Sequence, residues 1–275
     1  MRLVKQLLVV AVIAFAGSQL VNLVHWNAPL TLILGLGTAV AALAAYAWIV
    51  RRTEKREPDE VALAGSRRGL GRGVLIGVAL FTAVIANIAL LGGYRIDGWG
   101  SVGGTVALVG FMAAAAVTEE LIFRGVLFRI VEGRFGTWWA LGGTGLLFGL
   151  SHLFNPHAGL WGAIAVAVEA GGMLAACYAA TRTLWVPIGL HFGWNFAEAG
   201  LFGTEVSGNN SPEGIVHGVM SGPAALTGGS FGPEAGLYSV LAGVIVTVVF
   251  MWLARRRGLI MPRRTGATPA VTLAQ

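Results

Sequence analysis

Residues 102–130 read VGGTVALVGFMAAAAVTEELIFRGVLFRI, an apolar run in which Glu119, Glu120, Arg124 and Arg129 are the only charged side chains. A helix needs about 20 apolar residues to cross the hydrocarbon core of a bilayer, so this run is long enough to cross it and to project beyond it. The rest of the chain has the same character. It is 56% hydrophobic and 12% charged, with a mean hydropathy of +0.74, whereas a water-soluble domain carries about 25% charged residues.

Eight apolar runs of this kind divide the chain. They lie at about 5–24, 28–50, 73–93, 102–130, 137–154, 159–181, 184–203 and 235–254. Only helices and closed barrels satisfy the backbone within lipid, and the alternation typical of a membrane strand is absent. The sequence therefore predicts an all-α fold, a polytopic membrane helix bundle of about eight transmembrane helices, in a single domain over residues 1–260. Arg2 and Lys5 precede the first run as in a signal peptide, but the seven further runs favour a retained helix.

Basic residues gather at one end of these predicted spans. With the N- and C-termini both cytoplasmic, seventeen of the nineteen Lys and Arg residues fall on the cytoplasmic side, whereas Arg95 falls outside and Arg124 lies within a span. The seventeen are Arg2, Lys5, the seven in residues 51–72, Arg129, Arg134, Arg182 and the five in residues 255–264. This distribution follows the positive-inside rule. We therefore interpret the net charge of +6 as a topology signal and a contact with anionic lipid, and we expect no binding to nucleic acid.

Three segments fall outside the predicted spans. Residues 51–72 are expected to form a charged cytoplasmic loop, and residues 261–275 a disordered cytoplasmic tail. Residues 204–234 are rich in Gly, Ser, Asn and Pro and contain no Lys or Arg, so they should lie outside, as a surface loop, a re-entrant lid or a substrate contact. The single cysteine, Cys177, lies in an apolar stretch and is expected to be a small core residue.

Ionisable side chains inside predicted spans are costly in lipid, which makes them candidate functional groups. The first cluster is Glu119-Glu120-Leu-Ile-Phe-Arg124. Glu120 and Arg124 are four residues apart on one helix face, where they can pair. Glu119 points about 100° away from Glu120 and is left free, as a general base in a low-dielectric site would be. A purely structural pair of Glu120 with Arg124 would explain one of the two glutamates, but it explains Glu119 less well.

Two further clusters repeat the four-residue spacing. In Phe148-Gly-Leu-Ser-His152, the histidine taken alone is more typical of a core residue than of a catalyst. In His191-Phe-Gly-Trp-Asn195, two donors can aim at one point, as an oxyanion hole requires, or can join two helices by hydrogen bonds. Together the clusters place a carboxylate, two histidines and an amide on three helices. These groups are sufficient to activate a water and to stabilise a tetrahedral oxyanion.

In this order, the motifs Glu-Glu-x-x-x-Arg, Phe-x-x-x-His and His-x-x-x-Asn resemble those of the CPBP family, which comprises the type II CAAX prenyl endopeptidases and the bacteriocin-processing (Abi) proteins. The stretch Thr181-Arg-Thr-Leu-Trp-Val-Pro-Ile-Gly-Leu-His191 is similar to the family's lead-in to its third motif. The resemblance covers a family core at about residues 100–203. It implies an intramembrane endopeptidase with its site inside a helix bundle, where Glu120 and Arg124 would be supporting residues.

The resemblance also implies the roles of the other site residues. Glu119 would activate the attacking water, His152 would orient that water, and His191 and Asn195 would stabilise the oxyanion. Glu119, His152 and His191 offer nitrogen and oxygen ligands suited to zinc or another divalent metal. A metal-free, glutamate-based mechanism needs the same residues, so both mechanisms stay open. The chain lacks the HExxH helix of the common zinc peptidases.

Two alternatives to an enzyme also stay open. A non-catalytic membrane protein that binds a partner or confers bacteriocin immunity would keep the polar clusters for structure. A proton-coupled transporter would also carry Glu, His and Arg in its spans, although no internal repeat supports one. We favour a peptidase that hydrolyses peptide bonds of a membrane-associated peptide or membrane protein. The Ala-, Gly- and Arg-rich composition is typical of high-GC bacteria, so we expect an integral protein of a bacterial plasma membrane.

The motifs leave two glutamates and one difference in depth unexplained. Glu198 follows His191 by seven residues on nearly the same helix face, which makes it a further candidate for the site. Glu169 lies in the middle of an apolar run and is expected to be a buried hydrogen-bonding partner. His152 lies near the outer end of its run, whereas Glu119 and His191 lie closer to the cytoplasmic ends of theirs. A shared site therefore requires a fifth span that begins deeper or is tilted.

Overall fold

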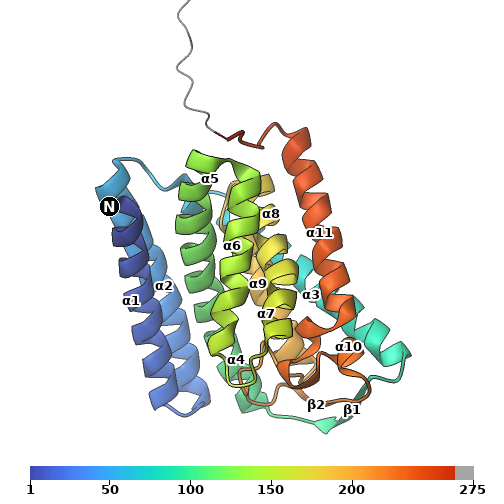
Figure 1. Ribbon diagram of the computed structural model, residues 1–275. Coiled ribbons are helices and arrows are strands. Elements are labelled where there is room, and N and C mark those ends of the chain that lie inside the picture. The colour runs from blue at the N-terminus through green and yellow to red at the C-terminus, as the bar shows by residue number, and fades with distance from the viewer. Residues whose placement is uncertain (264–275) are drawn as a thin grey trace, which may run out of the picture.

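The computed structural model describes residues 1–263, a bundle of helices with a small two-stranded sheet at one end (Figure 1). The α-helices are α1 (Arg2–Leu23), α2 (Ala28–Glu54), α3 (Ser66–Leu90), α4 (Val102–Glu120), α5 (Arg129–Phe135), α6 (Thr137–Ser151), α7 (Leu160–Val166), α8 (Met173–Thr181), α9 (Trp185–Asn195), α10 (Ala224–Thr227) and α11 (Leu237–Arg256). The strands are β1 (Tyr94–Trp99) and β2 (Val216–Met220). π-Helical segments are η2 (Leu121–Phe128), η4 (Ala167–Gly172) and η5 (Phe196–Leu201), and short 3-10 helices are η1 (Asp59–Val61), η3 (His152–Phe154), η6 (Gly229–Phe231) and η7 (Pro233–Ala235).

All eight predicted apolar runs contain helix, but six helices within residues 1–263 are long and apolar enough to cross a membrane. The six are Arg2–Leu23, Ala28–Glu54, Ser66–Leu90, Val102–Phe135, Leu160–Thr181 and Leu237–Arg256. The predicted fifth and seventh spans fall short, because α6 has 15 residues and α9 has 11 before it passes into η5. The helical membrane bundle is therefore confirmed, whereas the count of eight crossings is not.

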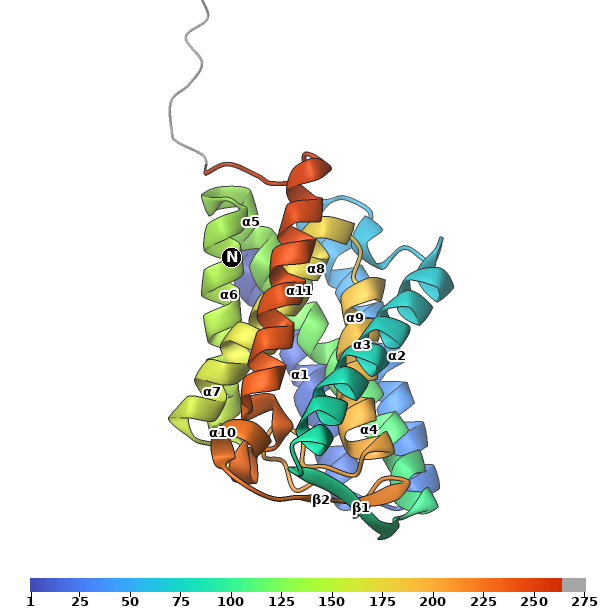
Figure 2. The ribbon, with the colours of Figure 1, turned by 90° about the vertical axis from the view of Figure 1, so that its right-hand side faces the viewer.

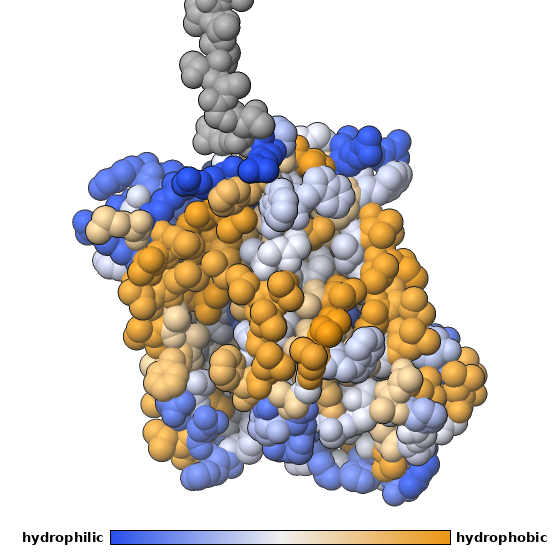
Figure 3. Space-filling view, viewed as in Figure 1, coloured by the Kyte–Doolittle hydropathy of each residue, from blue (hydrophilic) through white to orange (hydrophobic). Residues whose placement is uncertain are grey.

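Hydrophobic side chains form a band on the face of the bundle drawn in Figure 3, between two hydrophilic ends. Large apolar side chains such as Phe15 of α1, Trp139 of α6 and Ile245 of α11 are exposed, as expected for surfaces that face lipid. The start of α1, the segment 51–72 and the end of α11 lie at one end of the bundle, which we call the basic end (Figure 1). The strands and α10 lie at the opposite end, which we call the sheet end.

Glycines allow α3 and α9 to pack closely along their length, side by side as Figure 2 shows. A Cβ atom added to Gly77 of α3 would lie 2.4 Å from the Leu190 carbonyl oxygen. A Cβ atom added to Gly193 of α9 would lie 2.4 Å from the Val74 carbonyl oxygen. Each helix carries two glycines four residues apart, Gly73 with Gly77 and Gly189 with Gly193, the small-residue spacing that brings membrane helices together. This contact fixes the position of α9, which carries His191.

Charged side chains at the basic end hold η2 against α2. Arg129 donates hydrogen bonds of 2.7 and 2.8 Å to the two carboxylate oxygens of Glu54, and its Nε donates to the Gly125 carbonyl oxygen at 2.8 Å. The Tyr46 hydroxyl lies 2.9 Å from the same carbonyl oxygen and within hydrogen-bonding distance of the Glu60 carboxylate. Because Gly125 lies in η2, this network fixes the π-helical segment that follows Glu119 and Glu120.

The segment 204–234 was predicted as a loop, but part of it forms helices and a strand. It contains β2, α10, η6 and the start of η7, and β2 pairs antiparallel with β1 from Tyr94 opposite Met220 to Trp99 opposite Val216. Neither strand was predicted, because the two are more than 100 residues apart and each needs the other for its backbone hydrogen bonds. The register is irregular between Ile96 and Gly98.

The chain remains in contact with the bundle after α11 ends. The Met261 backbone N–H donates to Thr137 Oγ1 at 2.8 Å, and the Thr137 N–H donates to the Met261 carbonyl oxygen at 3.0 Å. The predicted disordered tail therefore begins with a residue bound to the start of α6. The remainder of that predicted tail, residues 264–275, lies outside the described residues.

Candidate active site

The predicted pair of Glu120 and Arg124 lies in the centre of the bundle. Arg124 Nη1 donates a 2.7 Å hydrogen bond to Glu120 Oε1, and the two side chains are 1% and 0% exposed. Glu119 precedes Glu120 on α4, and its side chain is 33% exposed. The four-residue spacing thus separates the two acids as predicted, with one buried in an ion pair and the other open to a cavity.

Arg124 also binds a second helix through backbone carbonyls. Its Nη2 donates to the carbonyl oxygens of Ala170 and Gly171 in η4, at 3.1 and 3.2 Å. A π-helical turn departs from the regular i to i+4 bonding of an α-helix, and such turns are frequent at functional sites. The guanidinium lies 4.6 Å from the centroid of the Phe148 ring of α6, at cation–π distance. Arg124 therefore joins η2, η4 and α6 behind the site.

His191 lies between the two acids. Its Nδ1 is 3.1 Å from Glu120 Oε1, and its Nε2 is 3.9 Å from Glu119 Oε2. A carboxylate that accepts a hydrogen bond from one ring nitrogen fixes the tautomer and the orientation of the ring. Glu120 therefore holds His191 with Nε2 directed towards Glu119. The sequence predicted Glu120 only as a partner of Arg124, because Glu120 and His191 are 71 residues apart.

His152 and Asn195 lie at the ends of two other helices. His152 is the first residue of η3, directly after α6, and its Nδ1 is 2.8 Å from the Phe148 carbonyl oxygen. Its Nε2 is therefore the ring nitrogen left for another partner. Asn195 is half-buried at the end of α9, directly before η5. The Phe148 ring contacts both histidines, at centroid distances of 4.9 Å from His152 and 6.0 Å from His191.

The side chains of Glu119, His152, His191 and Asn195 line one cavity of about 170 Å³. We call this cavity the polar cavity. It is lined by Phe111, Met112, Ala115, Glu119, Ser151, His152, Asn155, His191, Asn195, Val206, Ser207 and Asn209. Four of the six predicted site residues line it, whereas Glu120 and Arg124 lie behind it. The expected conflict in depth does not arise, because α6 ends at Ser151 and its short length brings His152 to the cavity.

The remaining polar residues of the lining were not predicted from the sequence. Asn155 follows η3, and Ser207 and Asn209 belong to the segment 204–234. The only indication in the sequence was that this segment could act as a re-entrant lid or a substrate contact. The Asn155 side chain donates a 2.7 Å hydrogen bond to the Ser207 carbonyl oxygen. The His157 backbone N–H donates to the Gly208 carbonyl oxygen at 3.1 Å. These bonds hold the segment against the chain that follows α6.

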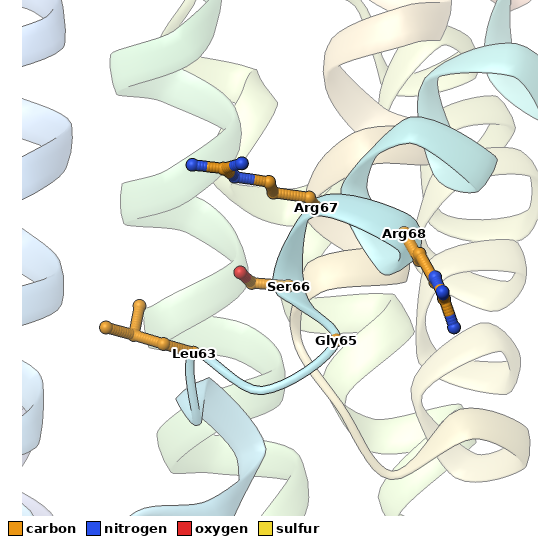
Figure 4. A pocket seen from close by; sticks show the side chains of 5 residues that line it. All are labelled: Leu63, Gly65, Ser66, Arg67 and Arg68. Carbon is orange, nitrogen blue, oxygen red and sulfur yellow. The ribbon is translucent and has the colours of Figure 1, made fainter.

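A larger, mainly apolar groove adjoins the polar cavity. It has a volume of about 720 Å³ and lies between α1, α2, α4 and the end of α6. Its lining shares Phe111, Ala115, Glu119 and Ser151 with the polar cavity. Glu119 therefore lies where a polar and an apolar space meet. A hollow at the basic end, drawn in Figure 4, contains none of the motif residues, and there Arg67 and Arg68 point away from each other.

The proposed ligands do not form a metal centre. A zinc ion requires nitrogen and oxygen atoms at about 2.0–2.2 Å from one point. Among residues 1–263, no group of three or more His, Cys, Asp or Glu side chains is arranged to hold a metal ion. His152 and His191 each have Nδ1 engaged, with the Phe148 carbonyl oxygen and with Glu120, which leaves Nε2 of each ring for another partner. The positions of Glu119, His152 and His191 do not bring three ligand atoms to one point in this arrangement.

Glu169 and Glu198 lie outside the polar cavity. Both are completely buried, in η4 and η5, and Glu234 from η7 lies close to them and is also buried. Glu234 accepts a hydrogen bond from the hydroxyl of Ser207, so it contacts the cavity wall from behind. The burial of Glu169 was predicted correctly, but its expected role as a hydrogen-bonding partner was wrong, because neither of its carboxylate oxygens has a hydrogen-bond partner among the described residues. Glu198 is not among the lining residues.

The comparisons with known proteins bear on the segment that forms this site. The family model described as type II CAAX prenyl endopeptidase Rce1-like matches residues 101–197, which contain all three motifs and run from the start of α4 into η5. No curated protein and no solved structure matches the chain. Residues 101–197 are therefore similar to the Rce1-like type II CAAX prenyl endopeptidase family, a family of membrane proteases, in agreement with the resemblance of the three motifs.

Proposed function

We propose that the protein is an intramembrane endopeptidase that hydrolyses peptide bonds of membrane-associated peptides or membrane proteins. The observation that carries this proposal is the shared cavity. Glu119, His152, His191 and Asn195, from three separate helices, line a space of about 170 Å³, large enough for a water and part of a peptide main chain. The match to a family of membrane proteases supports the same activity.

Glu119 is the general base in this proposal. Its Oε2 has no hydrogen-bond partner among the described residues, and it lies 3.9 Å from His191 Nε2. Glu119 takes a proton from a water in the cavity, and the water oxygen attacks the carbonyl carbon of the scissile bond. The protonated Glu119 then gives its proton to the leaving amine nitrogen as the C–N bond breaks. The proton count closes, because the new carboxyl group and the amine share the two hydrogens of the water.

The amide of Asn195 stabilises the oxyanion that forms during the attack. A donor at this position removes about 3–4 kcal/mol from the barrier in enzymes where one has been deleted. His191 presents Nε2 to the same cavity, because its Nδ1 is held by Glu120. His152 lies on the α6 side of the cavity with Nε2 available, and it orients the attacking water.

Glu120 and Arg124 are positioning residues in this proposal. They do not line the cavity, and they act through the orientation of His191. The chain is then an integral protein of a bacterial plasma membrane, with both termini on the cytoplasmic side.

A cleavage assay with one conservative variant tests the activity. The purified protein in detergent is incubated with a library of quenched-fluorescent peptides, beside Glu119→Gln and the matched control Glu213→Gln, whose carboxylate is exposed at the sheet end. We expect cleavage by the wild type and by Glu213→Gln, and none by Glu119→Gln. Equal cleavage by Glu119→Gln would refute the assignment.

A further inference from the structure

The surroundings of the polar cavity differ between the side that faces the basic end and the side that faces the sheet end. On the side of the polar cavity that faces the basic end, buried residues lie next to the site on each helix that carries a site residue. Glu120 and Arg124 follow Glu119 on the way to α5, Phe148 precedes His152 on α6, and Leu190 precedes His191 on α9. These four residues are almost fully buried, with exposed fractions of 0% for Glu120 and Leu190, and 1% for Arg124 and Phe148. The cavity is thus closed towards the basic end.

Towards the sheet end the surroundings are open and polar. Ser151 and His157 are exposed, and Asn155 and Asn209 are partly exposed. Ser151, Asn155 and Asn209 line the polar cavity, Ser151 as the last residue of α6 and the two asparagines in the segments that follow α6 and η5. Asparagine and serine side chains offer both donors and acceptors, which match the N–H and C=O groups of a peptide main chain.

From these two observations, together with the charge distribution, we infer that substrate reaches Glu119 from the sheet end, which is the external side of the membrane. The basic residues lie at the opposite end, and the positive-inside rule assigns that end to the cytoplasm. The substrates are therefore polypeptide segments exposed at the external membrane surface, with their main chain against Asn155, Ser207 and Asn209. This inference rests on the proposed function only for the identity of the occupant as a peptide.

The segment 204–210 forms the wall at this entrance and is firmly held. The Thr204 N–H and hydroxyl each donate to the Glu198 carbonyl oxygen at 3.0 Å. His157 Nε2 lies 2.7 Å from Asn210 Oδ1, and the Asn210 N–H donates to Glu205 Oε1 at 2.7 Å. The wall is therefore a preformed surface that lines the entrance.

Labelling of introduced cysteines tests the direction of access without any need for cleavage. The only native cysteine, Cys177, is 0% exposed, so the wild type serves as an unlabelled control. Three variants are compared: Asn209→Cys at the entrance, Trp99→Cys on β1, which is 86% exposed, and Leu63→Cys at the basic end, which is 81% exposed. Each is expressed in bacterial spheroplasts and treated with a charged, membrane-impermeant maleimide before or after lysis.

We expect Asn209→Cys and Trp99→Cys to be labelled in intact spheroplasts, and Leu63→Cys only after lysis. Labelling of Asn209→Cys only after lysis, or in neither condition, would overturn the inference, and so would labelling of Leu63→Cys in intact spheroplasts.

The same reagent links the entrance to turnover once a cleaved peptide is known. Modification of Asn209→Cys from outside should abolish cleavage, whereas modification of Trp99→Cys should leave it unchanged. Full cleavage by modified Asn209→Cys would overturn the route. Absence of cleavage by the wild type would instead count against the proposed function and would leave the labelling result standing.

Discussion

His191 Nδ1 lies 3.1 Å from Glu120 Oε1, and the same carboxylate oxygen accepts a 2.7 Å hydrogen bond from Arg124. One buried carboxylate oxygen thus joins the first and third motifs, while the guanidinium of Arg124 reaches Phe148 of the second motif. The motif residues therefore contact one another between motifs as well as across the four-residue spacing within each motif. The motifs form a single network behind the cavity.

Loss of Arg124 should destabilise the protein strongly. Arg124→Ala would leave Glu120 buried without its cation, and breaking a buried ion pair in this way costs about 3–5 kcal/mol. The control Arg134→Ala removes an exposed arginine that follows on α5 and should change the stability by less than about 0.5 kcal/mol. Unfolding in detergent, followed by circular dichroism against denaturant, compares the two. Equal stability of both variants would contradict a structural role for the network.

Asn195→Ala should reduce kcat with little change in KM. If the amide stabilises the oxyanion, its removal lowers kcat by about 10²–10³. Asn87→Ala is the matched control, because Asn87 is exposed on α3 and its amide bonds only to the Ala83 carbonyl oxygen in the same helix. Steady-state kinetics on one cleaved peptide give both constants. A rise in KM with unchanged kcat would assign Asn195 to substrate binding.

The α3–α9 contact should not tolerate a single methyl group. Gly77→Ala places a Cβ atom 2.4 Å from the Leu190 carbonyl oxygen, and such overpacking costs about 1–3 kcal/mol. Gly71→Ala, also on α3, meets open space and should stabilise the helix by about 0.5–1 kcal/mol. Thermal unfolding in detergent measures the two opposite shifts. Equal melting temperatures of the two variants would show that the close approach of α3 and α9 does not contribute to the free energy of unfolding.

Glu60 should contribute stability that is lost in acid. Burial opposes the charged form of Glu60, but hydrogen bonds from Arg56 and Tyr46 outweigh burial and hold the pKa of its carboxyl below the usual value of 4.5. A carboxyl whose pKa is lowered on folding stabilises the folded state above its unfolded pKa, and this contribution falls as the pH drops through the folded pKa. Glu60→Gln should therefore lower stability at pH 7 by about 1–3 kcal/mol.

The difference between Glu60→Gln and the wild type should shrink as the pH falls below about 4.5, the usual pKa of the carboxyl. Melting temperatures from pH 7 down to pH 3.5 follow this change. Glu57→Gln is the control, because that carboxylate is exposed and pairs only with the exposed Arg51. A constant difference across this range would contradict the linkage to Glu60.

Much of the fold could be predicted because the thickness of the bilayer determines how long an apolar run must be to cross it. The runs at 102–130 and 235–254 became α4 with its extension to Phe135, and α11. Hydropathy does not report how far a buried helix extends, so α6 and α9 were both assigned as full crossings. The π-helical segments also escaped prediction. In two of them, carbonyl groups accept hydrogen bonds from side chains distant in sequence, those of η4 from Arg124 and that of Gly125 in η2 from Tyr46.

The site was predicted where its residues share one helix and missed where they do not. The pairing of Glu120 with Arg124 follows from four-residue spacing. The contact of Glu120 with His191 depends on how α4 packs against α9, which no spacing within either helix reports. The glycine spacing of α3 and α9 is visible in the sequence and could have identified only the contact between those two helices. Ser207 carries no such signal, because its position depends on long-range bonds such as that from Asn155.

In the proposed mechanism, Glu119 activates a water for attack on a peptide bond. The direct measurement is cleavage of a library peptide in water enriched in ¹⁸O, with the products analysed by mass spectrometry. We expect one ¹⁸O atom in the new carboxyl group of the wild-type product, and no product from Glu119→Gln. Cleavage by Glu119→Gln at the wild-type rate, with the same incorporation of ¹⁸O, would contradict the role of Glu119 as the base.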